Sequence, residues 1–134
     1  MILVFKMPKI VRNFEVRNVP GKGRGVFATS RLKQGEIIEE SPVIVIPSRE
    51  EKHLEKTELY NYYFAWKKKD IAVALGYGSL FNHSYSPNAK YDFKYGKKLI
   101  IVKALREINA GEEITFNYNW NPKDKSPIWF KPKK

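Results

Sequence analysis

The chain has 134 residues, of which 43% are hydrophobic and 14% aromatic, and this is enough apolar material for one packed domain rather than a disordered chain. It contains no cysteine, which excludes disulfides and thiolate metal sites and permits a reducing, intracellular compartment. Lysine and arginine number 25 against 14 aspartate and glutamate, and the net charge of +11 favours anionic partners.

Neither export nor membrane insertion is indicated. The apolar run Ile2 to Phe5 is far shorter than the roughly 7–15 residues of a signal-peptide core, and no stretch approaches the ~20 residues of a membrane span. Since N-glycosylation requires the secretory route, Asn82-His83-Ser84 is not interpreted as an acceptor site.

The pattern of residues predicts a mainly β domain. Segments rich in Val, Ile, Phe and Tyr that end at Gly, Pro or Asn are typical of strands, and they occupy 10–16, 24–30, 35–46, 89–105 and 112–118. A hairpin turn is expected at Tyr95-Gly96-Lys97. One helix is predicted over 48–59, with Ser48 as its N-cap and Glu51 completing a capping box. We expect a single domain at 1–121 and an appended basic and aromatic tail at 122–134.

Several familiar chemistries do not fit the sequence. Zinc needs three or four ligands, and His53 and His83 are the only histidines in a chain without cysteine, so no metal site is predicted. Ser79 follows the second glycine of GYGSLF instead of standing inside a G-x-S-x-G nucleophile elbow. The glycines of PGKGRG lack the third glycine of a dinucleotide fingerprint and no helix pattern follows them.

Three stretches taken together, GKGRGVFA (21–28), LGYGSLFNHSYSPN (75–88) and GEEITFNY (111–118), resemble the SET domain family of S-adenosylmethionine-dependent protein lysine methyltransferases. The chain is similar to the small viral and prokaryotic members without cysteine-rich flanks. The resemblance implies several short curved sheets, a knot-like C-terminal crossing and one short helical insert. It also implies methyl transfer to a protein lysine, of a histone or another chromatin-like protein.

The resemblance assigns roles to individual residues. The glycine loop and the Asn-His pair would hold S-adenosylmethionine through Gly23, Arg24, Gly25, Asn82 and His83. Tyr118 matches the catalytic tyrosine, which would orient the reacting groups. The wall of the substrate-lysine channel would comprise Tyr62, Tyr63, Phe64, Tyr77, Tyr91 and Phe116. The tail would serve as a lid anchored by Trp120, Trp129 and Phe130.

The sequence leaves several alternatives open. A phenylalanine at Phe116 accompanies multiple methylation in the family, while a tyrosine near Tyr91 accompanies monomethylation in some members, so the product number is not fixed. Ser79 and Asn117 stand where the family often has Arg and Asp. A basic, β-rich nucleic-acid-binding module and a non-catalytic protein-interaction module are the rival interpretations. A weak nucleic-acid association, a homodimer, and a cytoplasmic or chromatin-associated (nucleoid-associated) location are all compatible with the sequence.

Overall fold

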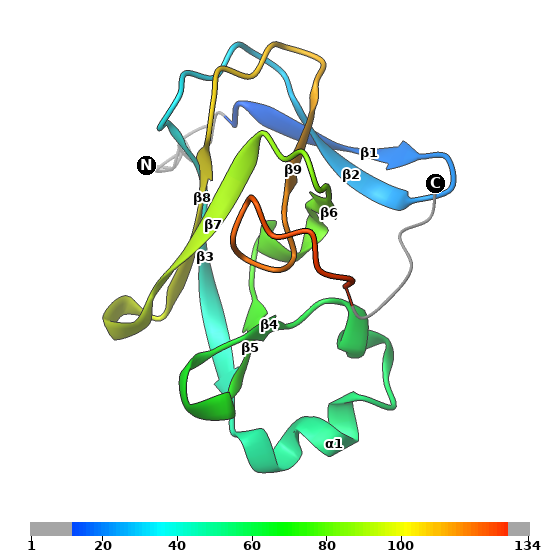
Figure 1. Ribbon diagram of the computed structural model, residues 1–134, viewed down its shortest axis with the longest axis vertical. Coiled ribbons are helices and arrows are strands. Elements are labelled where there is room, and N and C mark those ends of the chain that lie inside the picture. The colour runs from blue at the N-terminus through cyan, green and yellow to red at the C-terminus, as the bar shows by residue number, and fades with distance from the viewer. Residues whose placement is uncertain (1–11, 129–134) are drawn as a thin grey trace, which may run out of the picture.

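The computed structural model describes residues 12–128, which form two β-sheets (Figure 1). The first sheet has the order β1-β2-β9-β6 and consists of β1 (Phe14–Val19), β2 (Gly23–Ala28), β6 (Asn82–His83) and β9 (Glu113–Phe116). The second has the order β4-β5-β3-β8-β7 and consists of β3 (Ile37–Ile46), β4 (Phe64–Ala65), β5 (Ile71–Ala74), β7 (Ala89–Lys94) and β8 (Leu99–Ala104). The mainly β class predicted from the sequence is confirmed.

Strand β9 joins the distant parts of the first sheet. It pairs antiparallel with β2, where Ile114 lies opposite Val26, and parallel with β6, where Thr115 lies opposite Asn82. Strands β1 and β2 form an antiparallel hairpin whose turn reaches Gly23 at a φ of +80°, a conformation that favours glycine. The pairing of β6 with β9 brings the NHS motif beside the C-terminal motif, as expected for a crossing of these segments.

One continuous hydrophobic core connects the two sheets. Val26 and Ile114 of the first sheet and Ile100 and Val102 of the second are all fully buried members of it. Burying a side chain of this size stabilises the fold by about 1.5–3 kcal/mol. The core therefore fixes the two sheets against each other and, with them, the loops that carry the polar motifs.

The predicted helix over 48–59 is wrong in its extent. The structure has a 3-10 turn (Ser48–Glu50), a single turn of α-helix, α1 (Glu51–Leu54), and a second 3-10 turn (Glu58–Asn61). Thr57 interrupts the helix because its side chain donates to the Leu54 carbonyl (2.8 Å) and accepts from the Leu59 amide (3.3 Å). One short helical insert remains, as the resemblance implied.

The predicted capping box is also wrong. Pro47 occupies the N-cap position and makes no side-chain cap bond, while Ser48 lies inside the first 3-10 turn. The Ser48 amide donates instead to the Asp70 carboxylate at 2.9 Å. This bond ties the start of the helical insert to the turn between β4 and β5.

The hairpin predicted at residues 95–97 is confirmed, whereas three short strands were not predicted. Strands β7 and β8 pair antiparallel and are joined by a 3-10 turn at Tyr95–Lys97. Strands β4 and β6 have two residues each, too few for an alternating pattern to be recognised, and the four residues of β5, IAVA, are all apolar and do not alternate.

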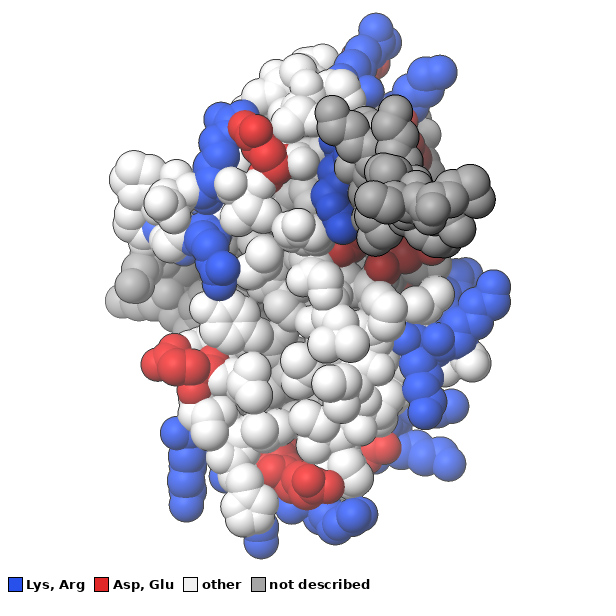
Figure 2. Space-filling model, turned by 180° about the vertical axis from the view of Figure 1, so that it is seen from behind, with Lys and Arg blue, Asp and Glu red and all other residues white. Residues whose placement is uncertain are grey.

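The surface reflects the excess of basic residues. On the face seen in Figure 2, lysine and arginine side chains project along both margins, and a band of uncharged residues runs between them. No helix within the described part of the chain is long and apolar enough to cross a membrane.

Candidate active site

Two cavities meet beside Tyr118. The aromatic cavity has a volume of about 540 Å³ and the polar cavity about 550 Å³, both in the range of small-molecule sites. Their walls share the residues Asn61, Tyr62, Ser79, Phe81 and Tyr118. A group bound in one cavity can therefore reach a group bound in the other past the Tyr118 side chain.

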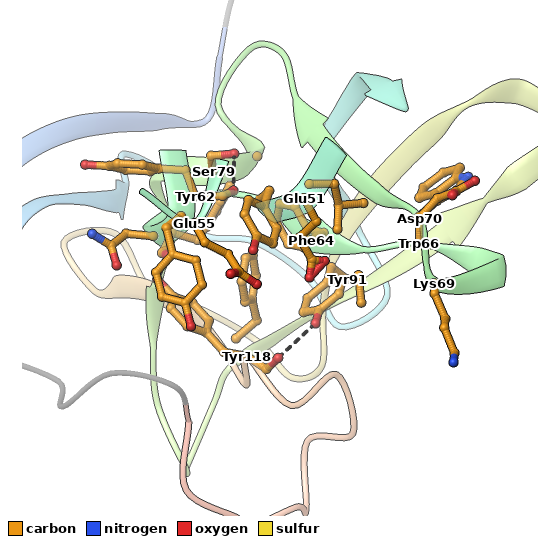
Figure 3. A pocket seen from close by; sticks show the side chains of 18 residues that line it. Glu51, Glu55, Tyr62, Phe64, Trp66, Lys69, Asp70, Ser79, Tyr91 and Tyr118 are labelled. Carbon is orange, nitrogen blue, oxygen red and sulfur yellow. Dashed lines mark hydrogen bonds between the residues drawn. The ribbon is translucent and has the colours of Figure 1, made fainter. Parts of the chain in front are cut away.

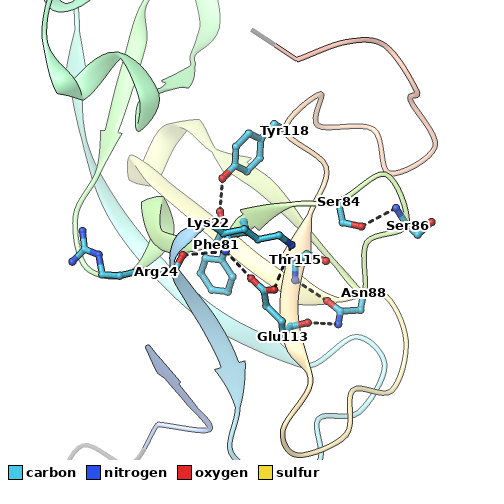
Figure 4. Close-up of polar contacts among 10 residues, drawn as sticks. Lys22, Arg24, Phe81, Ser84, Ser86, Asn88, Glu113, Thr115 and Tyr118 are labelled. Atoms are coloured by element: carbon cyan, nitrogen blue, oxygen red, sulfur yellow. Dashed lines mark hydrogen bonds and ion pairs between the residues drawn. The ribbon is translucent and has the colours of Figure 1, made fainter. Parts of the chain in front are cut away.

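Tyr118, two residues beyond β9, is held at three points. Its hydroxyl donates to the Phe81 carbonyl at 2.6 Å, and its backbone amide donates to Nδ1 of His83 at 3.0 Å (Figure 4 shows the first bond). Its own carbonyl accepts from the Tyr91 hydroxyl at 3.2 Å. These contacts fix both the backbone and the ring, so the hydroxyl occupies one position at the junction of the cavities.

The hydroxyls of Tyr118 and Tyr91 stay protonated at neutral pH. Burial raises the pKa of Tyr118 well above 10, and the Glu113 carboxylate and Tyr62 raise it further. Burial likewise raises the pKa of Tyr91, with a contribution from Tyr118. Tyr118 is therefore a neutral hydrogen-bonding group and not a phenolate base.

Aromatic rings form the inner wall of the aromatic cavity (Figure 3). Phe116 is fully buried, and its ring centroid lies 4.8 Å from that of Tyr91 and 5.4 Å from that of Phe81. Phe64 packs edge-on against Tyr91 at 5.1 Å. Such a wall suits the aliphatic stem of a long side chain.

Carboxylates lie at the outer part of the same cavity. Glu51 and Glu55 come from α1 and the residue that follows it, and both line the cavity with Tyr63 (Figure 3). Burial, and then the charges of Glu51 and Glu55, raise the pKa of Tyr63 to about 12. Neither glutamate has an ion-pair partner within residues 12–128, although lysine and arginine greatly outnumber acidic residues in the chain. Their negative charge is available to a cationic ligand.

The polar cavity lies against the start of β2. Its wall contains Lys22, Gly23, Arg24, Asn82 and His83, so four of the predicted cofactor-binding residues come together there. A Cβ added to Gly23 would meet nothing within 4 Å, because the backbone there faces open space. Exposed backbone groups and two basic side chains in one hollow suit a ligand that carries a carboxylate.

Gly25, the fifth predicted cofactor-binding residue, is buried beneath this wall. A Cβ there would lie 2.6 Å from a Glu113 carboxylate oxygen and 2.9 Å from the Asn82 amide nitrogen. The space is filled by a polar cluster in which Asn82 donates to the Arg24 carbonyl (3.0 Å) and to Glu113 (2.6 Å) (Figure 4). Lys22 lies 3.9 Å from the other Glu113 oxygen. Gly25 is thus required for the approach of β6 to β2.

His83 has a buried nitrogen without a partner. Nδ1 accepts from the Tyr118 amide, so the proton of the neutral ring belongs on Nε2. Nε2 is buried and has no hydrogen-bond partner in the part of the chain that is described. Burial also lowers the pKa of His83 from 6.5, which favours the neutral ring. A buried N–H donor beside a cavity is costly to leave unpaired, and an acceptor on a ligand would satisfy it.

Asn88 and Glu113 hold the crossing together, and the sequence alone did not identify either role. The Asn88 side chain donates to the Glu113 carbonyl (2.8 Å) and accepts from the Thr115 amide (2.9 Å). Asn88 closes the N-H-S-x-x-P-N motif and Glu113 belongs to GEEITFNY. Membership of these motifs was the available signal. At the junction of the cavities, Ser79 and Phe81 lie within the stretch 75–88 but were given no site role, and Asn61 carried no signal.

Two predicted residues lie away from the cavities. Tyr77 lines neither of them and packs edge-on against Phe14 at 5.2 Å. Trp120 also lines neither and is 51% exposed. Trp129 and Phe130, the other proposed lid anchors, fall outside the described residues.

The segment that follows Tyr118 folds back onto the domain. Asn117, which is buried, donates to the Asp124 carbonyl at 2.6 Å. The Ser126 carbonyl accepts from the Tyr85 hydroxyl (2.9 Å) and from the Asn119 side chain (2.7 Å). Residues 122–128 of the predicted tail are therefore attached beside the NHS motif.

Comparison with known proteins identifies related chains. A profile described as the SET domain matches residues 23–119. The chain is 34% identical over 126 residues to a Schizosaccharomyces pombe protein named histone-lysine N-methyltransferase, H3 lysine-37 specific, which covers 93% of this chain and 82% of that protein. It is 39% identical over 126 residues to the Plasmodium falciparum variant-silencing SET domain-containing protein, covering 83% of this chain but 5% of that protein.

A solved structure has a similar fold. The crystal structure of a Plasmodium falciparum protein, described as a candidate histone methyltransferase, superposes with a TM-score of 0.67 at 28% identity. The match covers 91% of this chain and 100% of that chain. The resemblance thus includes most of the chain that forms the two sheets.

Proposed function

The chain belongs to the SET domain family of protein lysine methyltransferases, and from that premise we propose that it transfers a methyl group from S-adenosylmethionine to the side-chain amine of a lysine in a basic, histone-like protein. The observation that carries the proposal is the meeting of an aromatic cavity and a polar cavity at Tyr118. The cofactor occupies the polar cavity, and the lysine enters through the aromatic cavity from the other side.

The polar cavity fits the cofactor in two respects. Lys22 and the backbone of Gly23 and Arg24 suit its carboxylate, and the Nε2 donor of His83 suits an acceptor nitrogen of its adenine. The Asn82 side chain stabilises the wall of the cavity and does not donate to the cofactor, because both its amide hydrogens already bond to the Arg24 carbonyl and the Glu113 carboxylate. When bound, S-adenosylmethionine supplies an electrophilic methyl group.

The aromatic cavity selects the neutral amine. At pH 7 a lysine of pKa ≈ 10.4 is neutral in only about one molecule in 2,500, and neutralising half requires a shift of roughly 3.4 units, or about 4.6 kcal/mol. Desolvation between Tyr91, Phe116 and Phe64 disfavours the cation at the inner end. Tyr118, a neutral hydroxyl held by the Phe81 carbonyl, orients the reacting groups without removing a proton.

The substrate is proposed to be a basic segment. Glu51 and Glu55 place unpaired negative charge at the outer part of the aromatic cavity, where residues flanking the target lysine would lie. The Schizosaccharomyces pombe relative is named for methylation of a histone, a strongly basic protein, and this supports the same class of substrate here. Chromatin is the corresponding location.

The net charge of +11 adds a second interaction. Lysines and arginines along the margins of the molecule favour a weak, salt-sensitive association with nucleic acid, or with substrates already bound to it. Such binding would assist the enzyme on chromatin and does not require a separate function.

The proposal is tested by incubating the purified chain with core histones and S-adenosylmethionine carrying a radiolabelled methyl group. We expect label in at least one histone, and at least tenfold slower labelling with Tyr118→Phe at equal concentration. Mass spectrometry of the product gives the number of methyl groups. Absence of transfer to any histone, together with no heat of binding for S-adenosylhomocysteine at millimolar concentration, would contradict the proposal.

A further inference from the structure

A buried polar pair lies on β3, outside both cavities. Glu39 is 8% exposed and Ser41 is fully buried, on a strand face whose next inward residue is apolar. The register of β3 against β8 shifts between Ile37 and Glu39, and such a bulge turns a side chain toward a new direction. Neither side chain has a role in the chemistry proposed above.

Both side chains accept hydrogen bonds from one loop. The Glu39 carboxylate accepts from the Tyr77 amide at 2.8 Å, and the Ser41 hydroxyl oxygen accepts from the Gly78 amide at 3.0 Å. The Ser41 hydroxyl donates in turn to Glu39 at 3.4 Å. Two successive backbone amides are therefore fixed to β3 by side chains.

The charge of Glu39 is compensated at this position. The Arg12 guanidinium lies 3.6 Å from its second oxygen and 4.4 Å from the centroid of the Tyr77 ring. A buried carboxylate is costly unless it is paired and hydrogen-bonded, and this one is both. The predicted channel residue Tyr77 thus belongs to the support of the loop.

Two glycines allow the loop to lie this close. Gly76 has a φ of +72°, and a Cβ there would lie 2.9 Å from the Glu39 carboxylate. A Cβ on Gly78 would lie 2.7 Å from the Ser41 hydroxyl and 3.0 Å from the Ala74 side chain. The spacing L-G-Y-G is explained by this contact with β3.

The same loop continues into the active site. Gly78 begins a 3-10 turn (Gly78–Leu80) that leads to Phe81, whose carbonyl accepts the Tyr118 hydroxyl. Ser79, within the turn, donates to the Tyr62 carbonyl at 3.1 Å across the junction of the cavities. A displacement of Gly78 would move each of these groups.

We propose that Glu39 and Ser41 are positioning residues: they fix the loop 76–81 and thereby set the place of the Phe81 carbonyl and the Tyr118 hydroxyl at the junction of the cavities. The proposal rests on the proposed function for its kinetic consequence, but its structural statement does not depend on turnover.

The kinetic test is a double-mutant cycle between Ser41→Ala and Tyr118→Phe. Ser41→Ala alone should lower kcat by about tenfold with the KM for S-adenosylmethionine unchanged within about twofold, since it displaces a reacting group without removing a cofactor contact. In the Tyr118→Phe background the same change should cost less than about twofold, because its effect passes through Tyr118. An equal loss in both backgrounds would overturn the proposal.

A spectroscopic test is independent of activity. With 13C-labelled tyrosine, the ring Cζ signal that Tyr118→Phe removes should shift in Ser41→Ala and stay in place in Ser30→Ala, which removes an exposed hydroxyl outside both cavities. Glu39→Gln keeps an acceptor for the Tyr77 amide and should shift the signal less than Glu39→Ala. The comparison of Glu39→Gln with Glu39→Ala also tests the proposal if Ser41→Ala does not fold. An unmoved Tyr118 signal overturns the proposal, whereas a wild-type chain without methyl transfer refutes only the proposed function.

Discussion

The hydroxyl of Tyr118 donates to the backbone carbonyl of Phe81 at 2.6 Å, although the two residues are 37 positions apart. The parallel pairing of β6 with β9 creates this proximity, because Phe81 directly precedes β6 and Tyr118 lies shortly beyond β9. The bond directs the hydroxyl to the junction of the two cavities. The pairing of two distant motifs thus determines the orientation of the proposed catalytic group.

Tyr118→Phe tests that role. The variant loses the hydroxyl, while the ring keeps its contacts with Phe116 (5.7 Å) and His83 (5.2 Å). Single-turnover methyl transfer should slow at least tenfold, equivalent to about 1.4 kcal/mol of barrier. Calorimetry with S-adenosylhomocysteine should give an affinity within about twofold of wild type. A variant that transfers methyl at the wild-type rate would show that Tyr118 does not act in catalysis.

Gly25→Ala tests the polar cluster beneath the cofactor site. The new methyl group would lie 2.6 Å from a Glu113 carboxylate oxygen and 2.9 Å from the Asn82 amide nitrogen, so these two side chains must shift and their hydrogen bonds must change. We expect about 1–3 kcal/mol of destabilisation and weaker S-adenosylhomocysteine binding. Gly96→Ala is the matched control, because a Cβ there meets nothing within 4 Å. Equal melting temperatures and affinities for the two variants would show that the cluster tolerates the displacement.

The fold was predictable from the sequence where strands are long and regular. In the hairpin of β7 and β8, Tyr and Phe alternate with polar residues in the first strand, and Leu, Ile and Val follow one another in the second, after a Gly-containing turn; this hairpin was predicted. Strand β6 has two residues and exists because tertiary packing brings it beside β9. The helix over 48–59 was predicted too long because local propensity did not reveal that Thr57 bonds the backbone on both sides.

The site was predictable where a motif fixes the backbone. The polar cavity is lined by Gly23, Asn82, His83 and Tyr118. Each of these residues lies in β2 or β6, or just beyond β9, and the pairing of these strands brings them together. Tyr77 stands one residue from a cavity-lining glycine, yet its ring points toward Phe14. Which face of an irregular loop a side chain takes depends on packing from β1 and β3, and residue types alone do not indicate it.

The half-buried His83 predicts a pH dependence of stability. Burial lowers its pKa below the ordinary value of 6.5, so the unfolded chain takes up this proton first as the pH falls. The stabilisation of the folded chain by neutral His83 is fully present above about pH 6.5 and is lost as the pH falls below that value. The fall in melting temperature from pH 7.5 to 5.5 should be smaller in His83→Asn, whose side-chain oxygen takes the place of Nδ1 as the acceptor for the Tyr118 amide.

Carboxylates do not obscure that comparison. Hydrogen bonds from the Asn109 amide and then from Arg106 lower the pKa of Glu112 below 4.5. The stability that Glu112 contributes is therefore lost only at more acidic pH, and equally in the wild type and the His83 variant. An equal fall in melting temperature for wild type and His83→Asn would mean that His83 titrates alike in the folded and unfolded chains.

Neutralising the carboxylates of the aromatic cavity should weaken substrate recognition. Glu51→Gln with Glu55→Gln should raise the KM for a lysine- and arginine-rich peptide by about three- to tenfold at low salt, with kcat nearly unchanged. The difference should shrink at high salt because exposed charges are screened. Glu40→Gln removes one negative charge from an exposed position that lines neither cavity and should have no effect. An equal KM for the double variant and the control would exclude recognition of the peptide's charge by Glu51 and Glu55.

Truncation after Asn121 tests the tail. It removes the Asp124 carbonyl that accepts from the buried Asn117 side chain, and the Ser126 carbonyl that accepts from Tyr85. A buried amide left unpaired costs about 1–3 kcal/mol. We expect a folded domain with a lower melting temperature, weaker S-adenosylhomocysteine binding and much reduced turnover.

A second truncation, after Ile128, separates the two parts of the tail. It keeps the hydrogen bonds of Asp124 and Ser126 and removes Trp129 and Phe130. If these aromatic residues anchor a lid that excludes water from the junction of the cavities, this truncation alone should reduce turnover while the melting temperature stays close to wild type. Unchanged kinetic constants after Ile128, with a loss only after Asn121, would assign the effect to the hydrogen bonds of residues 122–128. Unchanged constants in both would place the lid elsewhere, since neither part of the tail would then shield the reacting groups.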